Sequence, residues 1–339
     1  MRIAAFPKGD LPDMVLRRTK SVFEWIDEAR ALGVDGLELH TGFLWSADPG
    51  YLRTVGDALA AADFEMPMMC ASPDLTHPDA DARAREIEQQ AAAMRVTAQL
   101  GGRGSTCRVL SGQAHPGVDV DRGVEWAVSA IESLLPLAAE LGITLAIENH
   151  YKASTWAYPE FAQRPQVFRR IVDAVSDRVH FGVQFDPSNA ITAGVDSADF
   201  LDDVVDRVVT MQASDRYLEP GTTLDDLRQA DGTLGYSPAL RHGVIGRGLN
   251  DYDRIFSTLV AAGYDGWISI EDGVNGFAEL KASADFLLDA RDRWFGGSRA
   301  VAVRSHDRAR AEAARTLTGG TTSDDGTREE TPWAARSGA

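Results

Sequence analysis

The stretch LAIENHYKAS, residues 145–154, ends an apolar segment on a carboxylate and an imidazole. Glu148 and His150 stand two residues apart, so in an extended strand their side chains face the same side. Three other apolar segments end on oxygen-bearing side chains, namely Asp186 in HFGVQFD, Gln212 in VVTMQASD and Glu271 in WISIED. Side chains of these types bind divalent cations and transfer protons. They form a site only if the fold brings them together.

Eight short apolar segments alternate with amphipathic helical patterns along the chain. The predicted strands are Arg2–Phe6, Gly36–His40, Glu65–Cys70, Thr106–Leu110, Thr144–Asn149, His180–Asp186, Val208–Asp215 and Trp267–Asp272. Between the first two, residues 21–33 place apolar side chains on one helical face and stop at Gly33. This order predicts an α/β fold, a (β/α)8 TIM barrel, with a doubly wound sheet as the alternative architecture.

The barrel is expected to form a single domain over residues 1–295, closed by a helix that ends near Phe295. Between the seventh and eighth strands the chain inserts roughly 33 loop residues, 216–248, and loops of this length are usually functional or disordered. Residues 296–339 are rich in Ser, Thr, Gly and charge, which predicts a flexible C-terminal tail, with RAEAARTL as a helical fragment.

The composition argues against several classes of partner. The chain has 51 acidic and 34 basic residues, a net charge of −17, which repels nucleic acids and anionic membranes. Its two cysteines, Cys70 and Cys107, lie in no metal-type spacing, and the N-terminus lacks the apolar run of a signal peptide. We therefore expect a cytoplasmic enzyme.

Alternation along the strands separates apolar from polar side chains. In the fifth predicted strand Leu145 and Ile147 face one side, whereas Glu148 faces the other. In the other strands, the residues expected on the same side as Glu148 are Glu38, His40, Gln184, Asp186, Thr210, Gln212, Ser269 and Glu271. The acidic members fall near the carboxyl ends of the strands, where barrel active sites lie. The pattern predicts a polar pocket at the mouth of a barrel.

Three carboxylates would share this pocket. Glu148, Asp186 and Glu271 are costly to bury bare, and like charges a few ångströms apart raise each other's pKa. A divalent cation removes this penalty, and ligation by oxygens of these residues and Gln212 suits Mn²⁺, or Mg²⁺, better than zinc. The alternative is that the carboxylates cap helices or form ion pairs with Arg108, Lys152 or Arg216.

Together these stretches resemble the xylose isomerase-like barrels, which include sugar isomerases, sugar 3-epimerases and the endonuclease IV group. The resemblance covers roughly residues 1–295 and implies metal ligands at Glu148 in AIENH, Asp186 in FDPSNA and Glu271 in SIEDG. The seventh strand departs from the family, because many members have His in a His-x-Lys-Asp pattern where this chain has Gln212. A neutral amide oxygen is a weaker ligand, which makes Gln212 the weakest of the four.

Within that superfamily, ENHYKAS, TWAYPEF, MQASDRYLE and GRGLNDYD are most similar to the large (alpha) subunit of C-glycoside deglycosidases. Those enzymes cleave the carbon–carbon bond between a 3-oxo sugar and its aromatic aglycone. The closer resemblance implies this lyase activity and a small beta subunit in a hetero-oligomer, with a homo-oligomer as the alternative assembly.

Isomerisation, epimerisation and deglycosylation all begin by removing a proton from the carbon next to a carbonyl. The step needs a Lewis acid to hold the developing enolate and a base near the proton. His150 lies one pleat beyond Glu148 and titrates near neutral pH, so it is the expected base. The resemblance adds a catalytic role for Glu148 and Glu271, and the alternative for His150 is a hydrogen bond to a group behind the site.

Substrate contacts are expected from polar and aromatic residues near the pocket, each of which has an ordinary structural alternative. They are Glu38, His40, Asn189, Arg247 and Trp156.

Three rival functions stay open: an isomerase or 3-epimerase of free keto sugars, an endonuclease IV-like DNA repair enzyme, and a non-catalytic sugar-binding barrel. The repair enzyme is disfavoured, because the chain has seven His and a strong negative charge.

Overall fold

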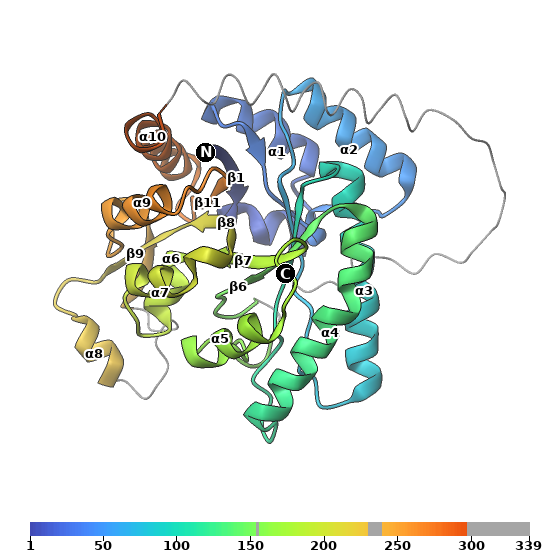
Figure 1. Cartoon of the computed structure of the whole chain (residues 1–339). Helices are drawn as coiled ribbons and strands as arrows, with labels where there is room; N and C mark the ends of the chain where they lie inside the picture. The colour runs from blue at the N-terminus through green and yellow to red at the C-terminus, as the bar shows by residue number, and fades with distance from the viewer. Residues whose placement is uncertain (154–155, 230–238, 297–339) are drawn as a thin grey trace.

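The computed structural model describes residues 1–153, 156–229 and 239–296, in which helices surround a central sheet (Figure 1). The strands are β1 Arg2–Pro7, β2 Gly36–Leu37, β3 Leu39–His40, β4 Met68–Cys70, β5 Thr106–Val109, β6 Thr144–Glu148, β7 Phe181–Phe185, β8 Val208–Ala213, β9 Asp215–Leu218, β10 Leu240–Gly243 and β11 Trp267–Asp272. The helices are α1 Val22–Ala29, α2 Pro49–Ala61, α3 Ala80–Gly101, α4 Val120–Leu141, α5 Pro165–Ala174, α6 Pro187–Thr192, α7 Ser197–Val204, α8 Leu224–Gln229, α9 Tyr252–Ala261 and α10 Phe277–Trp294.

The main sheet is parallel and nearly closed. Its strand order is β2-β1-β11-β8-β7-β6-β5-β4-β3. The strands β2 and β3 are consecutive pieces of one strand interrupted at Glu38, and they lie at opposite ends of this order. That interrupted strand joins the two ends, so the eight predicted strands form a TIM barrel, and the doubly wound alternative is wrong.

The two faces of the strands differ in polarity, as the alternation in the sequence predicts. Leu145 and Ile147 are fully buried in the hydrophobic core that the sheet shares with the helices, and Val183 of the neighbouring β7 joins them. The opposite parity, which contains Glu148 and Gln184, is buried as well, although its side chains are polar. The barrel interior is therefore lined by polar groups near its carboxyl end.

The first helix forms where its sequence pattern predicts it. Ser21 and Glu24 build a capping box, in which the Ser21 hydroxyl accepts from the Glu24 N–H and Glu24 reaches back to the Ser21 N–H. Gly33 follows with a φ of 76°, a left-handed conformation that glycine adopts without a steric penalty. This ending turns the chain into β2.

Two predicted strands differ from the observed strands by more than one residue at an end. The strand expected at Glu65–Cys70 begins only at Met68, because Glu65 makes one isolated bridge to Gly36. The strand expected at Val208–Asp215 ends at Ala213, and Asp215 begins a separate hairpin of β9 with β10. The described parts of the 216–248 segment are thus partly regular, whereas residues 230–238 lie outside the described residues.

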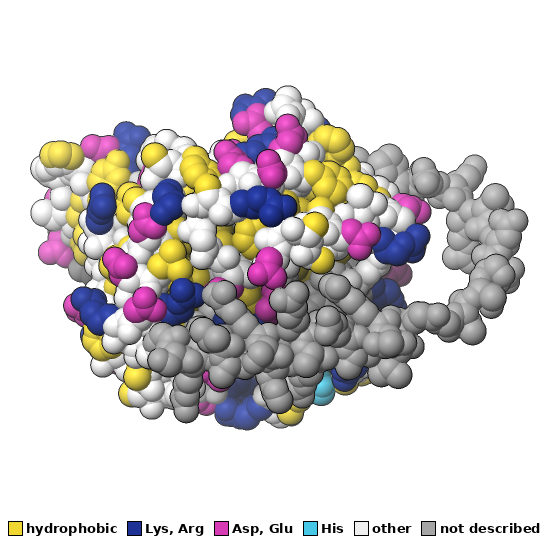
Figure 2. All heavy atoms as spheres, turned by 90° about the horizontal axis from the view of Figure 1, so that it is seen from above, with side chains coloured by type: hydrophobic (Ala, Val, Ile, Leu, Met, Phe, Trp, Pro, Cys, Tyr) yellow, Lys and Arg dark blue, Asp and Glu magenta, His cyan; other side chains and the backbone are white. Residues whose placement is uncertain are grey.

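The surface is of mixed charge in the view from above. Figure 2 shows Lys and Arg side chains interspersed with Asp and Glu over the described part of this face. Every helix in the described ranges is too short or too polar to cross a membrane. The flexible tail and helical fragment predicted after residue 296 lie outside the described residues.

Candidate active site

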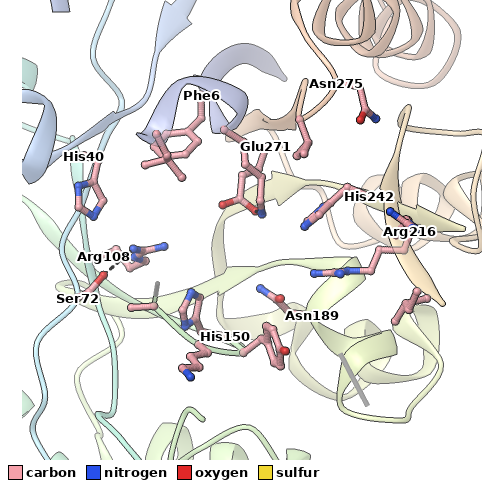
Figure 3. Close-up of a pocket in the computed structure, with 18 of the residues that line it drawn as sticks. Phe6, His40, Ser72, Arg108, His150, Asn189, Arg216, His242, Glu271 and Asn275 are labelled. Atoms are coloured by element: carbon pink, nitrogen blue, oxygen red, sulfur yellow. Dashed lines mark hydrogen bonds and ion pairs between the residues drawn. The ribbon is translucent and has the colours of Figure 1, made fainter. Parts of the chain in front are cut away.

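A cavity of about 630 Å³ opens at the carboxyl ends of the barrel strands. Its wall includes Lys8 after β1, His40 at the end of β3, His150 after β6 and Glu271 in β11. Figure 3 shows His40, Arg108, His150, Asn189 and Glu271 around one shared space. The volume lies within the range of small-molecule sites.

Glu148 ends β6, is almost fully buried and is not among the residues that line the cavity. Its Oε2 accepts a 2.7 Å hydrogen bond from the Arg108 guanidinium, and its Oε1 accepts one of 3.0 Å from the Asn189 amide. Burial raises the pKa of Glu148 to about 7, although Arg108 lowers it and Glu271 raises it further. The ion pair with Arg108 is the structural alternative that the sequence left open.

Glu271 faces the cavity from β11, and Lys8 Nζ donates to its Oε2 at 2.7 Å. Burial works to raise the pKa of Glu271, but the charges of Lys8 and Arg108 outweigh this and lower it. Glu271 therefore stays ionised while its neighbours Glu148 and Asp186 resist ionisation. Carboxyl groups with opposed pKa shifts in one site are typical of acid–base chemistry.

Asp186 follows β7 and caps α6. Its Oδ1 accepts from the backbone N–H groups of Ser188 and Asn189 and from the Ser214 hydroxyl at 2.6 Å. Its Oδ2 is buried and accepts no hydrogen bond from the described residues. Burial raises the pKa of Asp186 to about 7, and the charges of Glu271 and Glu148 add to the shift.

Gln212 and Glu38 form a second buried pair. The Gln212 amide nitrogen donates to Glu38 Oε1, which also accepts from the Cys70 thiol at 3.0 Å. Burial raises the pKa of Glu38 to about 8. Gln212 Oε1 and Glu38 Oε2 are buried without a partner among the described residues. Gln212 thus presents an acceptor oxygen, the atom with which it would bind a cation.

These contacts test how well the four predicted ligands fit a divalent cation. Asp186 and Gln212 each keep a buried acceptor oxygen that needs a donor or a cation. Glu148 and Glu271 are instead paired with Arg108 and Lys8. In the part of the chain that the structure describes, no three His, Cys, Asp or Glu side chains gather as a metal cluster. The oxygen donors fit a hard cation in their chemistry, provided that Glu148 and Glu271 exchange their ion pairs for it.

His150 lies on the cavity wall, just beyond Glu148, as its parity predicts. Its side chain is 13% exposed, and its Nδ1 lies 3.4 Å from Oε2 of the buried Glu160. The Trp156 ring meets the His150 ring edge-on, with centroids 6.2 Å apart. Burial lowers the pKa of His150, so the imidazole is neutral at neutral pH.

The predicted substrate contacts divide into two groups. His40 and Asn189 line the cavity, and burial lowers the pKa of His40 to about 3, which keeps it neutral. Glu38 is fully buried and Trp156 packs with Leu110 and Ala153, and neither is among the residues that line the cavity. Arg247 is exposed on a turn and is not among the residues that line the cavity.

Among the residues of the site that were not predicted from the sequence, Lys8 and Glu160 make the contacts to Glu271 and His150. Ala4 and Phe6 of β1 pair with Ser269 and Glu271, whose side chains face the barrel interior. Lys8 continues the alternation of Ala4 and Phe6 just after β1. Strand alternation could therefore have predicted that Lys8 faces the site. Glu160 lies in the irregular segment after β6, where no periodicity marks it.

The sequence profile of a family described as xylose isomerase-like TIM barrel matches residues 26–290. Among curated proteins, none matches the chain. Several solved structures share its fold. The IOLI protein, solved with a zinc atom, is 15% identical over 87% of this chain and 100% of that chain, with a TM-score of 0.66.

Two further structures are sugar epimerases. D-psicose 3-epimerase, solved in the presence of D-fructose, is 14% identical over 87% of this chain and 100% of its own, with a TM-score of 0.64. The 3-keto-D-glucoside 4-epimerase from E. coli is 16% identical over 86% of this chain and 99% of its own, with a TM-score of 0.60. At such low identities these likenesses establish the fold alone.

Proposed function

The chain belongs to the xylose isomerase-like TIM barrel family, and from this membership we propose that it is a divalent-metal-dependent enzyme that abstracts a proton next to a sugar carbonyl. The observation that carries the proposal is the cavity itself. A neutral imidazole, His150, shares its wall with Glu271 and Arg108, and buried acceptor oxygens of Asp186 and Gln212 lie without partners.

The cation would be held by oxygens of Glu148, Asp186, Gln212 and Glu271. All four donors are oxygens, which favours Mn²⁺, or Mg²⁺, over zinc, although the similar IOLI protein was solved with zinc. When bound, the cation supplies Lewis-acid stabilisation for the charge that develops on the carbonyl oxygen. It would also offset the burial and the like-charge repulsion that raise the pKa of Glu148 and Asp186.

His150 acts as the general base in this proposal. The substrate C–H proton goes to the imidazole, and the bonding electron pair moves into the carbonyl to give an enolate. Because burial lowers its pKa, the imidazole is neutral and keeps the lone pair of one ring nitrogen free to accept the substrate proton. Glu271 lines the same cavity, and Glu148 is bonded to its lining residues Arg108 and Asn189. These two carboxyl groups are the candidates for returning a proton to the opposite face of the carbon.

Arg108 and Lys8 would orient the substrate. Both line the cavity, and both carry N–H groups that can donate to sugar hydroxyls or to the carbonyl oxygen. Arg108 is itself fixed by hydrogen bonds to Ala71 O at 3.1 Å and Ser72 Oγ at 3.0 Å. His40 and Asn189 complete the polar wall and would set which hydroxyls are accepted.

Two reactions use this machinery. Isomerisation or 3-epimerisation of a free keto sugar is supported by the similarity of the fold to that of D-psicose 3-epimerase. The second reaction is carbon–carbon cleavage of a 3-oxo-C-glycoside, in which the enolate expels the aromatic aglycone by elimination. The sequence resemblance supports it, and the cavity of about 630 Å³ has room for a ring besides the sugar.

The cellular location and the subunit composition of the enzyme are also part of the proposal. Cys70 and Cys107 are both free thiols buried in the core, which suits the reducing cytoplasm that we propose for it. A small beta subunit is proposed from the sequence resemblance, and co-purification of a second chain with the native protein is its test.

The experiment that tests the function is incubation of the Mn²⁺-loaded protein with a free ketohexose and, separately, with a 3-oxo-C-glucoside. Epimerised or isomerised sugar supports the first reaction, and release of a phenolic product supports the second. His150→Ala is the control for contaminating activity, because this variant should keep the cavity but lose the base. If wild type and variant convert neither substrate, or convert them equally, the proposal is wrong.

A further inference from the structure

Glu160 is a buried carboxylate that the proposed reaction does not use. Its side chain is fully buried, in the segment that follows β6. The backbone N–H of Ser111 donates to Glu160 Oε1 at 2.8 Å, and the Ser111 hydroxyl donates to the same oxygen. The hydroxyl in turn accepts from the Ala162 N–H at 3.0 Å, which fixes its proton on the Glu160 side. One carboxylate oxygen is thus fully occupied by Ser111.

The other oxygen points to His150. Glu160 Oε2 lies 3.4 Å from His150 Nδ1, and both atoms are buried without a hydrogen-bond partner among the described residues. Leaving two such atoms unpaired is costly, and a shift of a few tenths of an ångström would join them. Trp156 packs edge-on against the imidazole and limits its rotation. Catalytic hydrogen bonds are often long in free enzymes and tighten when the substrate binds.

We propose that Glu160 is a positioning residue that holds a proton on His150 Nδ1 and so presents the Nε2 lone pair to the cavity. Oε2 of Glu160 is the acceptor that lies beside Nδ1, so an imidazole with a single proton forms this hydrogen bond only when the proton is on Nδ1. Because His150 lines the cavity, the remaining nitrogen is the one available to a substrate (Figure 3). This inference rests on the proposed function, since only a base needs that lone pair.

The first test needs no variant. Nitrogen NMR of the ¹⁵N-histidine-labelled wild-type protein at about pH 8 reports which ring nitrogen of each His carries the proton. Loss of one signal pair in His150→Gln assigns the resonances. The proposal expects the proton of His150 on Nδ1, and a proton on Nε2 overturns it.

The second test separates positioning from a structural role. In Glu160→Gln the amide can either accept or donate, so the two tautomers of His150 should mix and kcat should fall roughly 10- to 100-fold with little change in KM. Glu86→Gln is the matched control, because Glu86 also anchors a loop through a backbone N–H, that of Asp74 at 3.2 Å. Both variants should lose stability, but only Glu160→Gln should alter the His150 spectrum.

The outcomes also separate this inference from the proposed function. A proton on Nδ1 in a protein that converts no keto sugar would leave the positioning intact and refute the chemistry. Conversion of a keto sugar by a protein with the proton of His150 on Nε2 would refute the positioning alone. An unchanged His150 spectrum in folded Glu160→Gln would likewise overturn it.

Discussion

Replacing Lys8 with Met should tighten the binding of Mn²⁺, because the Lys8 ammonium and the cation would compete for Glu271. Lys8 Nζ lies 2.7 Å from Glu271 Oε2, with the side chains only 21% and 12% exposed. A hydrogen bond to a charged group contributes about 1.5–3 kcal/mol, and about 1.4 kcal/mol corresponds to tenfold in affinity. The structure therefore predicts roughly 10- to 100-fold tighter Mn²⁺ binding in Lys8→Met.

Isothermal titration of the metal-free protein with Mn²⁺ measures this change directly. Lys8→Arg is the matched control, because it keeps the positive charge and should bind Mn²⁺ about as wild type does. Metal-free Lys8→Met should also melt below wild type, since Glu271 loses its counter-charge, and Mn²⁺ should restore the loss. If Lys8→Met binds Mn²⁺ no more tightly than Lys8→Arg, the assignment of Glu271 as a ligand fails.

Other substitutions follow from the same contacts. Asp186→Asn should weaken Mn²⁺ binding about tenfold or more, or about 1.4 kcal/mol, in the same titration. Asp196→Asn is its control, because it removes the charge of another helix cap and should change Mn²⁺ binding little. His150→Ala should lower turnover by about 10²–10⁴-fold while Mn²⁺ affinity stays at the wild-type value, and joint loss of both contradicts the base role. Glu38→Gln should become more stable relative to wild type as pH rises. The pKa of Glu38 is raised from 4.5 to about 8 in the folded protein, so between these values only the unfolded chain has lost the proton, and wild-type stability falls with pH. Chemical denaturation at about pH 5 and pH 8 measures the free energy of unfolding of both proteins. An equal difference between Glu38→Gln and wild type at the two pH values would falsify the raised pKa of Glu38.

The fold was predictable because strand alternation is a local property. The parity that separates Leu145 and Ile147 from Glu148 is readable in the sequence, and the parallel order then places Glu148, Asp186 and Glu271 at one end of the barrel. Strand ends were less predictable, since the break at Ala213 depends on the pairing of β9 with β10. Such pairing is a tertiary contact that no local pattern contains.

The pairing of one side chain with another in the site was harder to predict than which residues belong to the site. Arg108 was one of three basic residues that could have paired with the carboxylates, and only the register of β5 with β6 selects it for Glu148. Glu160 reaches His150 through a loop, and its position depends on the contact with Ser111. Side chains on irregular segments carry no period, so their positions come only from the folded chain.

Exchange of a substrate proton with solvent reports whether the protein abstracts the proton next to the carbonyl. The Mn²⁺-loaded protein is incubated in D₂O with a ketohexose or a 3-oxo-C-glucoside, and proton NMR follows the hydrogen next to the carbonyl. We expect wild type to replace this hydrogen with deuterium, and His150→Ala to do so at least about 100-fold more slowly. No exchange in either substrate, or equal exchange by wild type and variant, would contradict it.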